Sequence, residues 1–188
     1  VCQAIGDSPL GPFTKIQPKN GGFVGIPEQS WDIHGCGHHA FFEVNGELYI
    51  AYHTYQIGTE NTILKRYFAF DRIEWVYNDD GQYLLRSNGP SKSLQPLPSA
   101  ASGYTHVAKK SSPSVKGTNV TGSAASLNDG LIALREGDEN MLLSFSDDAE
   151  ITLTFEEYVS ARAILIYNSY DVSTAFSEID KIEFSYRK

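Results

Sequence analysis

The segment "HHAFFEVNGELYIAYHTY", residues 38–55, constrains the fold more than any other stretch of the chain. Two runs with alternating apolar and polar residues, rich in aromatic side chains, meet at Asn45-Gly46. Asn-Gly favours a type I′ turn, because both central residues of that turn need positive φ angles. The segment therefore predicts an antiparallel hairpin.

A second hairpin is expected directly afterwards, in "ILKRYFAFDRIEWVYNDDGQYLLRS" at residues 63–87, with its turn at Asp80-Gly81. Together the two hairpins predict a four-stranded antiparallel meander over residues 38–86. Because no segment shows a convincing 3.6-residue apolar period, the sequence predicts an all-β protein.

A change of composition follows the meander. Residues 87–116 contain eight Ser and four Pro, which is typical of a junction between domains. We therefore expect one domain over residues 1–100 and a second, a β-sandwich, over 101–188. In the second domain, strands are expected in "MLLSF", "EITLTFE", "ARAILIYNS" and "IDKIEFSYR". The continuous apolar run "ARAILIY" predicts a strand buried on both faces.

Charge and composition exclude several classes of function. The 188-residue chain has a net charge of −8, whereas a nucleic-acid binder needs a basic surface to neutralise phosphates. The same charge argues against an anionic membrane surface as a partner, and no apolar run approaches the roughly 18 residues of a membrane-spanning helix. The two cysteines, Cys2 and Cys36, form neither a disulfide framework nor a zinc pattern. A bridge between these two cysteines stays open.

A four-stranded meander alone exposes two faces and two edges, so it needs neighbouring sheets for stability. One blade of a β-propeller satisfies this requirement, because adjacent blades cover its faces. One complete meander is present in the sequence, preceded by a strand and turn in "VCQAIGDSPLGPF". We therefore expect further blades on the N-terminal side of this segment.

Three motifs resemble glycoside hydrolase family 43. They are "AIGDSPLGPFTK", "GCGHHAFFEVNGELYIAYHTY" and "RYFAFDRIEWVYNDDGQYLLRSNGPSKSLQPLP", which cover residues 4–98 in the order and spacing of that family. The resemblance implies the last blade of a five-bladed β-propeller. It also implies an inverting hydrolase that acts on arabinofuranosides and β-xylosides of plant glycans, in a secreted or periplasmic location.

Inverting hydrolysis needs two carboxylates on opposite sides of the glycosidic bond. The resemblance places these groups in earlier blades, so no catalytic residue is expected in this chain and the chain alone is expected to be inactive. The carboxylates of Asp32, Glu43, Glu47 and Glu60 are interpreted as solvated side chains. The alternative function is a non-catalytic carbohydrate-binding protein.

The histidines of "DIHGCGHH" suggest a ligand site. By motif position, the resemblance implies that His38 reaches the propeller channel and contacts a hydrated calcium ion; a structural, hydrogen-bonded histidine is the alternative. Gly35 and Gly37 allow a tight backbone turn beside it. His39 is expected to pack between sheets, and His53 is expected to make a structural hydrogen bond.

Three residues are candidates for contact with a sugar. The resemblance implies that Arg66 reaches the substrate pocket, with a surface ion pair as the alternative. His34 is placed at the pocket rim, and Trp31 is suited to stacking on a sugar face or to core packing.

The C-terminal part is similar to the galactose-binding-like, discoidin-type β-sandwich. The matching features are "ASLNDG", "ITLTF" and "ILIYNS", within residues 105–188. The resemblance implies a carbohydrate-binding domain that normally continues for several more strands. Asn128-Asp129-Gly130 is interpreted as a turn, with a structural calcium site as the alternative.

Overall fold

The computed structural model describes residues 3–16, 29–30, 33–56, 65–78, 80–90, 94–133, 138 and 141–186. The chain divides into two compact units, Val1–Thr105 and His106–Lys188. The described residues form strands in small antiparallel sheets and hardly any helix, so the predicted all-β class is confirmed.

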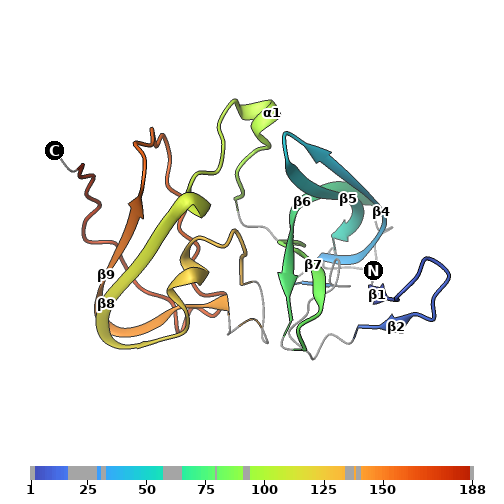
Figure 1. The fold of residues 1–188 in the computed structure, drawn as a ribbon, viewed down its shortest axis with the longest axis horizontal. Coiled ribbons are helices and arrows are strands. Elements are labelled where there is room, and N and C mark those ends of the chain that lie inside the picture. Colours follow the sequence, from blue (N-terminus) through green and yellow to red (C-terminus); the bar gives the residue numbers. More distant parts are fainter. Residues whose placement is uncertain are drawn as a thin grey trace. The chain divides into compact units, whose positions relative to one another are not determined.

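The first unit is built around one antiparallel sheet with the strand order β3-β4-β5-β6-β7 (Figure 1). A two-stranded sheet, β1-β2, precedes it, and a short helix, α1, follows it. The bounds are β1 (Ala4–Ile5), β2 (Thr14–Lys15), β3 (Gln29–Ser30), β4 (Ile33–Val44), β5 (Glu47–Gln56), β6 (Arg66–Tyr77), β7 (Tyr83–Ser87) and α1 (Ser99–Ser102).

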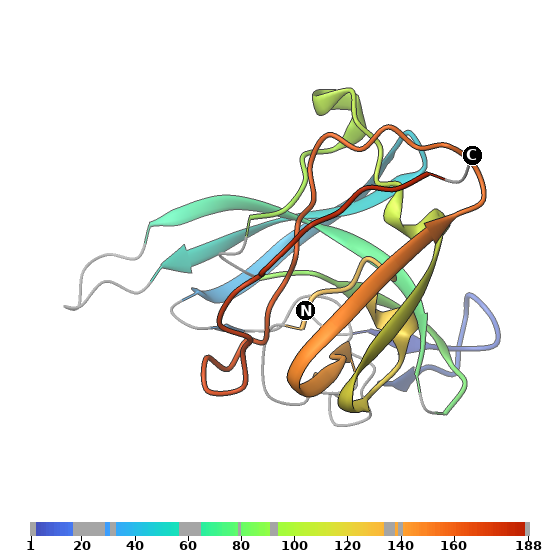
Figure 2. The ribbon, with the colours of Figure 1, turned by 90° about the vertical axis from the view of Figure 1, so that its left-hand side faces the viewer.

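Both predicted hairpin turns are confirmed. Asn45 and Gly46 join β4 to β5 with φ angles of 52° and 75°, as a type I′ turn requires. Between β6 and β7, Gly81 has a φ of 73° and donates its N–H to the Asn78 carbonyl at 2.9 Å. These turns set the register of the meander, whose long strands β5 and β6 run side by side in Figure 2.

Strand β4 departs from regular pairing at the glycine-spaced histidines. His38 and His39 together lie opposite Tyr52, which is a β-bulge, and a second irregularity in register lies directly before Gly37. His38 takes a φ of 49°, in the left-handed region that non-glycine residues rarely adopt. The tight backbone turn that was expected at Gly35 and Gly37 thus occurs at His38. The bulge changes the direction of the histidine side chains.

The core of the first unit consists of two hydrophobic clusters. The larger one joins three strands of the meander through Cys36, Ile50, Tyr52 and Ile73. The smaller one packs the β1–β2 hairpin against β6 and β7 through Ile16, Leu84, Ile5 and Val76. The Gln3 side chain adds a backbone-like pairing at the free edge of β7, where it accepts from Leu85 N–H at 3.0 Å and donates to Leu85 C=O at 3.2 Å.

A buried polar cluster joins the segment after β7, "LQPLP" at residues 94–98, to the sheet. The Tyr52 hydroxyl donates to the Asp71 carboxylate, and Gln95 Nε2 donates to the other Asp71 oxygen at 2.6 Å. Burial raises the pKa of the Asp71 carboxyl, although both hydrogen bonds act in the opposite direction. Burial, and then the adjacent carboxylate, raise the pKa of Tyr52. A side chain at Gly89 would overlap the Asp71 carboxylate, so this position needs glycine.

Glu47 provides a second anchor. Its carboxylate accepts the Ser99 N–H at 2.7 Å and lies 3.5 Å from an Arg72 nitrogen. Burial alone would raise the pKa of Glu47, but the hydrogen bonds from Ser99 and the charge of Arg72 outweigh burial and lower it. The interpretation of Glu47 as a solvated carboxylate is therefore wrong, because this side chain links β5 to α1.

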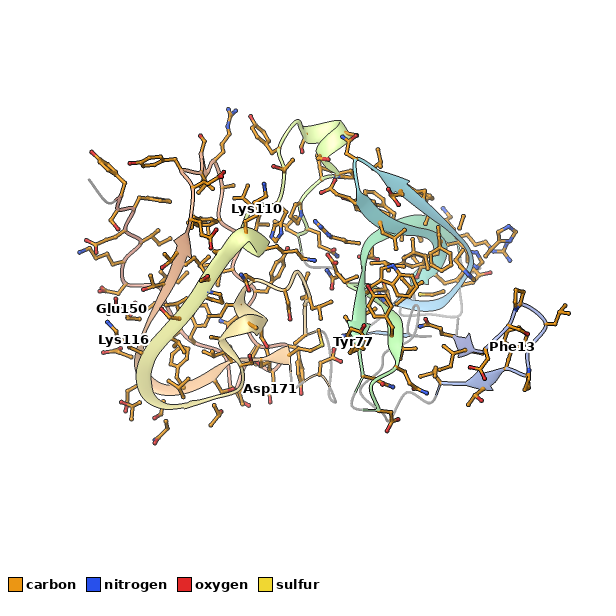
Figure 3. All side chains as sticks on the ribbon, viewed as in Figure 1. Phe13, Tyr77, Lys110, Lys116, Glu150 and Asp171 are labelled. Atoms are coloured by element: carbon orange, nitrogen blue, oxygen red, sulfur yellow. The ribbon has the colours of Figure 1, made fainter. Side chains whose placement is uncertain are left out.

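The second unit contains one antiparallel pair among its described residues, β8 (Ser111–Thr121) with β9 (Ser144–Phe155), and two 3₁₀ helices, η2 (Ala108–Lys110) and η3 (Ala124–Leu127). Lys116 lies directly opposite Glu150 in this pair (Figure 3). After η3, Asn128 donates to the Ala108 and Ser111 carbonyls at 3.0 and 2.8 Å. Asn128-Asp129-Gly130 thus forms the turn expected from the sequence.

Two strands expected in the second unit are not formed, since the described residues of "ARAILIYNS" and "IDKIEFSYR" belong to no strand. The serine-rich stretch predicted as the junction, residues 87–116, contains the division between the units at Thr105 and His106, although its last residues belong to β8, which begins at Ser111. The run "ARAILIY" does not form a strand buried on both faces. Ile164, Leu165 and Ile166 are 45–51% exposed, because no described strand pairs with them or covers them.

Residues 161–169 and 176–186 are extended segments joined by a turn (Figure 2). The Asn168 amide closes the turn, since it donates to Phe176 C=O at 2.8 Å and accepts from Phe176 N–H at 3.1 Å. Asp171 accepts the Ser173 N–H at 2.8 Å within it. None of the helices in the described part of the chain has the length and apolar character needed to cross a membrane.

Candidate functional site

The candidate site is an open pocket of about 330 Å³ on one face of the meander. Its described lining residues come from the middle of β4 and β5 and the beginning of β6. They are His38, Ala40, Ala51, Tyr52, His53, Arg66, Tyr67 and Phe68. The pocket thus brings together two residues that the sequence analysis selected separately, His38 and Arg66.

Strand alternation explains why these side chains share a face. In the β5–β6 register, His53 pairs with Phe68 and Tyr55 pairs with Arg66, and directly paired residues point to the same side of a sheet. His38 reaches this side at the bulge, where its ring centroid lies 6.4 Å from that of His53. The site therefore depends on β-sheet register and on one irregularity in β4.

Arg66 is held by an aromatic neighbour. Its Nε donates to the Tyr55 hydroxyl at 2.7 Å, and its guanidinium carbon lies 5.7 Å from the Tyr55 ring centroid. Tyr55 in turn packs edge-to-face against His53, with ring centroids 5.6 Å apart. A continuous chain of contacts thus runs from Arg66 through Tyr55 and His53 to His38.

Aromatic residues extend this face of the sheet beyond the pocket. Phe42 stacks on Tyr49 at 5.3 Å, Phe70 meets Tyr49 edge-on at 6.1 Å, and Phe68 lies 6.2 Å from Phe70. Burial, followed by the negative charge of Glu47, raises the pKa of Tyr49 to about 12, so its hydroxyl stays protonated near neutral pH. Phe68 is 77% exposed and offers an apolar surface beside Arg66.

The sequence-predicted site residues have different outcomes. Arg66 and His38 line the pocket, whereas Trp31 lies outside the described residues and only the backbone of His34, in β4, is described. The contact partner of Arg66 is Tyr55, not the acidic residue of a surface ion pair. His53, for which a structural hydrogen bond was expected, lines the pocket and packs against Tyr55. The alternation of these two residues with Ala51 along β5 is the signal that could have selected them.

The remaining expectations concern residues near the site. His39 is exposed and contacts Phe41 edge-on at 5.2 Å, so the expectation that it packs between sheets is wrong. Glu43 is exposed, in agreement with its interpretation, while Asp32 and Glu60 lie outside the described residues. Cys36 is a buried free thiol whose pKa is raised, chiefly by burial, while Cys2 lies outside the described residues.

Calcium does not fit the described surroundings of His38. Calcium takes six to eight oxygen ligands, mainly from carboxylates, carbonyls and water. The described lining residues instead supply two imidazoles, a guanidinium, two tyrosines and apolar groups without a carboxylate, and no cluster of three metal-binding side chains occurs among the residues that the structure describes. The calcium ion implied by the resemblance stays a prediction without support from these side chains.

Comparison of the chain with models of known protein families found no match, and comparisons with curated proteins and with solved structures found none either. The resemblance to glycoside hydrolase family 43 therefore rests on the sequence motifs, and the geometry of the pocket has to be judged by its own chemistry.

Proposed function

We propose that this chain contributes part of the carbohydrate pocket of a glycoside hydrolase of the arabinofuranosidase and β-xylosidase type. The observation that carries the proposal is the convergence of Arg66, His38 and His53 on one pocket. Guanidinium and imidazole groups donate hydrogen bonds to sugar hydroxyls, and an exposed ring such as Phe68 suits the apolar C–H face of a sugar. The motifs of residues 4–98 supply the enzyme class.

In this proposal, the first unit is the last blade of a β-propeller in which adjacent blades leave the pocket end of the sheet uncovered, and the second is a carbohydrate-binding β-sandwich. The resemblance implies that the two reacting carboxylates come from earlier blades, and none occurs among the described lining residues. A secreted or periplasmic location and plant arabinose- or xylose-containing glycans as substrates belong to the same proposal.

The second candidate is a non-catalytic carbohydrate-binding protein. The specific observation in its favour is the same lack of carboxylates in the described lining, because binding needs hydrogen-bond donors and an apolar surface but no proton transfer.

The test is an assay of the full-length protein on aryl arabinofuranosides and aryl β-xylosides, combined with calorimetric titration of arabino- and xylo-oligosaccharides. Hydrolysis with inversion, weakened by Arg66→Ala but not by Lys65→Ala, supports the enzyme. Binding without hydrolysis, with the same dependence on Arg66, supports the second candidate. The absence of both sugar binding and hydrolysis would contradict both candidate functions.

A further inference from the structure

The charge of the pocket differs from that of the whole chain. The chain carries 23 acidic residues against 15 basic ones. The described lining of the pocket nevertheless contains an arginine and two histidines and not one aspartate or glutamate. Such a lining repels a cation and attracts an anion, which also accounts for its poor fit to calcium.

Two arginines on the same face of β6 differ in whether a carboxylate neutralises their charge. Arg72 is neutralised, since its Nε lies 2.8 Å from Glu74 and its Nη1 3.5 Å from Glu47. Arg66 forms no ion pair with any carboxylate in the described part of the chain, and its contact is the neutral hydroxyl of Tyr55. Of these two arginines, Arg66 is the one whose charge no described carboxylate neutralises.

The guanidinium of Arg66 is oriented before a ligand arrives. Its Nε–H is engaged by Tyr55 at 2.7 Å, which leaves the N–H groups on the two terminal nitrogens to donate outward. Tyr55 is itself fixed against His53. A planar fork of N–H donors matches the two oxygens of a carboxylate, and holding it in place reduces the entropy lost on binding.

We propose that this pocket binds the carboxylate of a uronic acid residue in a pentose-containing glycan, with Arg66 as the main contact. This inference rests on the proposed carbohydrate-binding function of the same pocket. His38 and His53 donate to the anion or to the neighbouring hydroxyls, while Phe68 and the two alanines face the ring. The volume of about 330 Å³ lies at the lower end of ligand pockets and suits a single sugar unit.

The experiment is a calorimetric titration of the full-length protein with three ligands: xylotriose, xylotriose carrying one glucuronic acid, and the carboxyl-reduced form of the latter. The reduced ligand has the same size and linkage but carries a hydroxymethyl group in place of the carboxylate. We expect the acidic ligand to bind about tenfold more tightly than its reduced form, since a charge-assisted bidentate contact contributes at that level. Higher salt should narrow the difference.

Three variants assign the effect to Arg66. Arg66→Gln should abolish the tenfold preference, and Arg66→Lys should restore only part of it, because lysine keeps the charge but lacks the fork. Lys65→Gln removes a positive charge from the neighbouring residue, which does not line the pocket, and should leave the preference intact.

The outcomes separate this inference from the proposed function. Equal binding of the acidic and reduced ligands overturns the uronate inference and leaves carbohydrate binding in place. No binding of any of the three overturns both. Competition by inorganic sulfate as strong as that by free glucuronate overturns the assignment to a planar carboxylate, and equal losses in Arg66→Gln and Lys65→Gln overturn the role of Arg66.

Discussion

The two units of the chain differ in how fully they bury their aliphatic strand and run residues. In the first unit, Ile50 and Leu84 are completely buried within a five-stranded sheet and its covering hairpin. In the second unit, Ile164, Leu165 and Ile166 form an apolar run that remains about half exposed. The difference shows that an apolar run in the sequence predicts burial only where other strands of the same chain cover it.

The buried polar groups follow the same division. The first unit contains the Tyr52–Asp71–Gln95 cluster and the Glu47–Ser99 anchor, both of which tie the segment after β7 back onto the meander. In the second unit, Asn128 and Asn168 make the corresponding contacts, but these close local turns or join neighbouring loops. Substitutions should therefore have larger effects on stability in the first unit.

The largest expected effect comes from Ile50→Ala. Ile50 has no exposed surface, and deleting a buried isoleucine side chain leaves a cavity that lowers the free energy of unfolding by about 4 kcal/mol. The same change at Ile166, which is 51% exposed, should cost less than about 1 kcal/mol. Urea unfolding followed by circular dichroism measures both. Equal losses of unfolding free energy in the two variants would show that the two units do not differ in this way.

Asp71→Ala should lower the free energy of unfolding by about 3 kcal/mol, because it leaves the buried Tyr52 hydroxyl without its acceptor and removes the shorter hydrogen bond of the Gln95 amide. Both tryptophans of the chain, Trp31 and Trp75, lie within Val1–Thr105, so tryptophan fluorescence during urea unfolding reports on this unit. Glu43→Ala removes an exposed carboxylate from the same sheet and serves as the control. A loss no larger than that of the control would show that the cluster is not stabilising.

Gly89→Ala should cost about 2 kcal/mol, because the added methyl group would lie 2.8 Å from the Tyr52 hydroxyl and overlap the Asp71 carboxylate. Gly37→Ala is the matched control, since a methyl group there meets its nearest neighbour, the His53 ring, at an ordinary 3.8 Å. Thermal unfolding of the two variants gives the comparison. Similar melting temperatures for both would mean that the sheet tolerates a side chain at residue 89.

The smallest of these effects is pH-dependent. Because the pKa of Glu47 is lower in the folded protein than its ordinary value of 4.5, its charged form stabilises the fold above about pH 4.5. That stabilisation is lost as the pH falls through the folded-state pKa. Glu47→Gln should therefore cost about 1 kcal/mol at pH 7 and less at pH 3. Urea unfolding at both pH values measures the loss, with Glu43→Gln as control. An equal loss of unfolding free energy at pH 7 and pH 3 would show that the charge of Glu47 does not stabilise the fold.

The hairpin turns were predictable from the sequence because their chemistry is local. The positive φ angles at Asn45 and Gly46 follow from these two residues alone, and the all-β class follows from alternation along the strands. Strand β8 was missed because serine and proline dominate its composition, and its partner β9 begins more than twenty residues later. The local sequence pattern does not predict pairing between strands that lie so far apart in the chain.

The candidate site was predictable in part for the same reason. His38 was selected from the glycine-spaced motif and Arg66 from its position in the resemblance, and the structure places both in one pocket. The participation of His53 and Tyr55 follows from the register of β4, β5 and β6, including the bulge, which no single segment specifies. The opposite environments of His38 and His39 likewise follow from that bulge.

The most direct test of the proposed carbohydrate pocket is an NMR titration that follows the imidazole signals of the full-length protein as an arabino- or xylo-oligosaccharide is added. His38 and His53 line the pocket, while His39 contacts Phe41 and His106 belongs to the second unit. We expect the His38 and His53 signals to shift with saturation while those of His39 and His106 stay in place. Sugar binding that shifts His39 or His106 but leaves His38 and His53 unchanged would contradict the account.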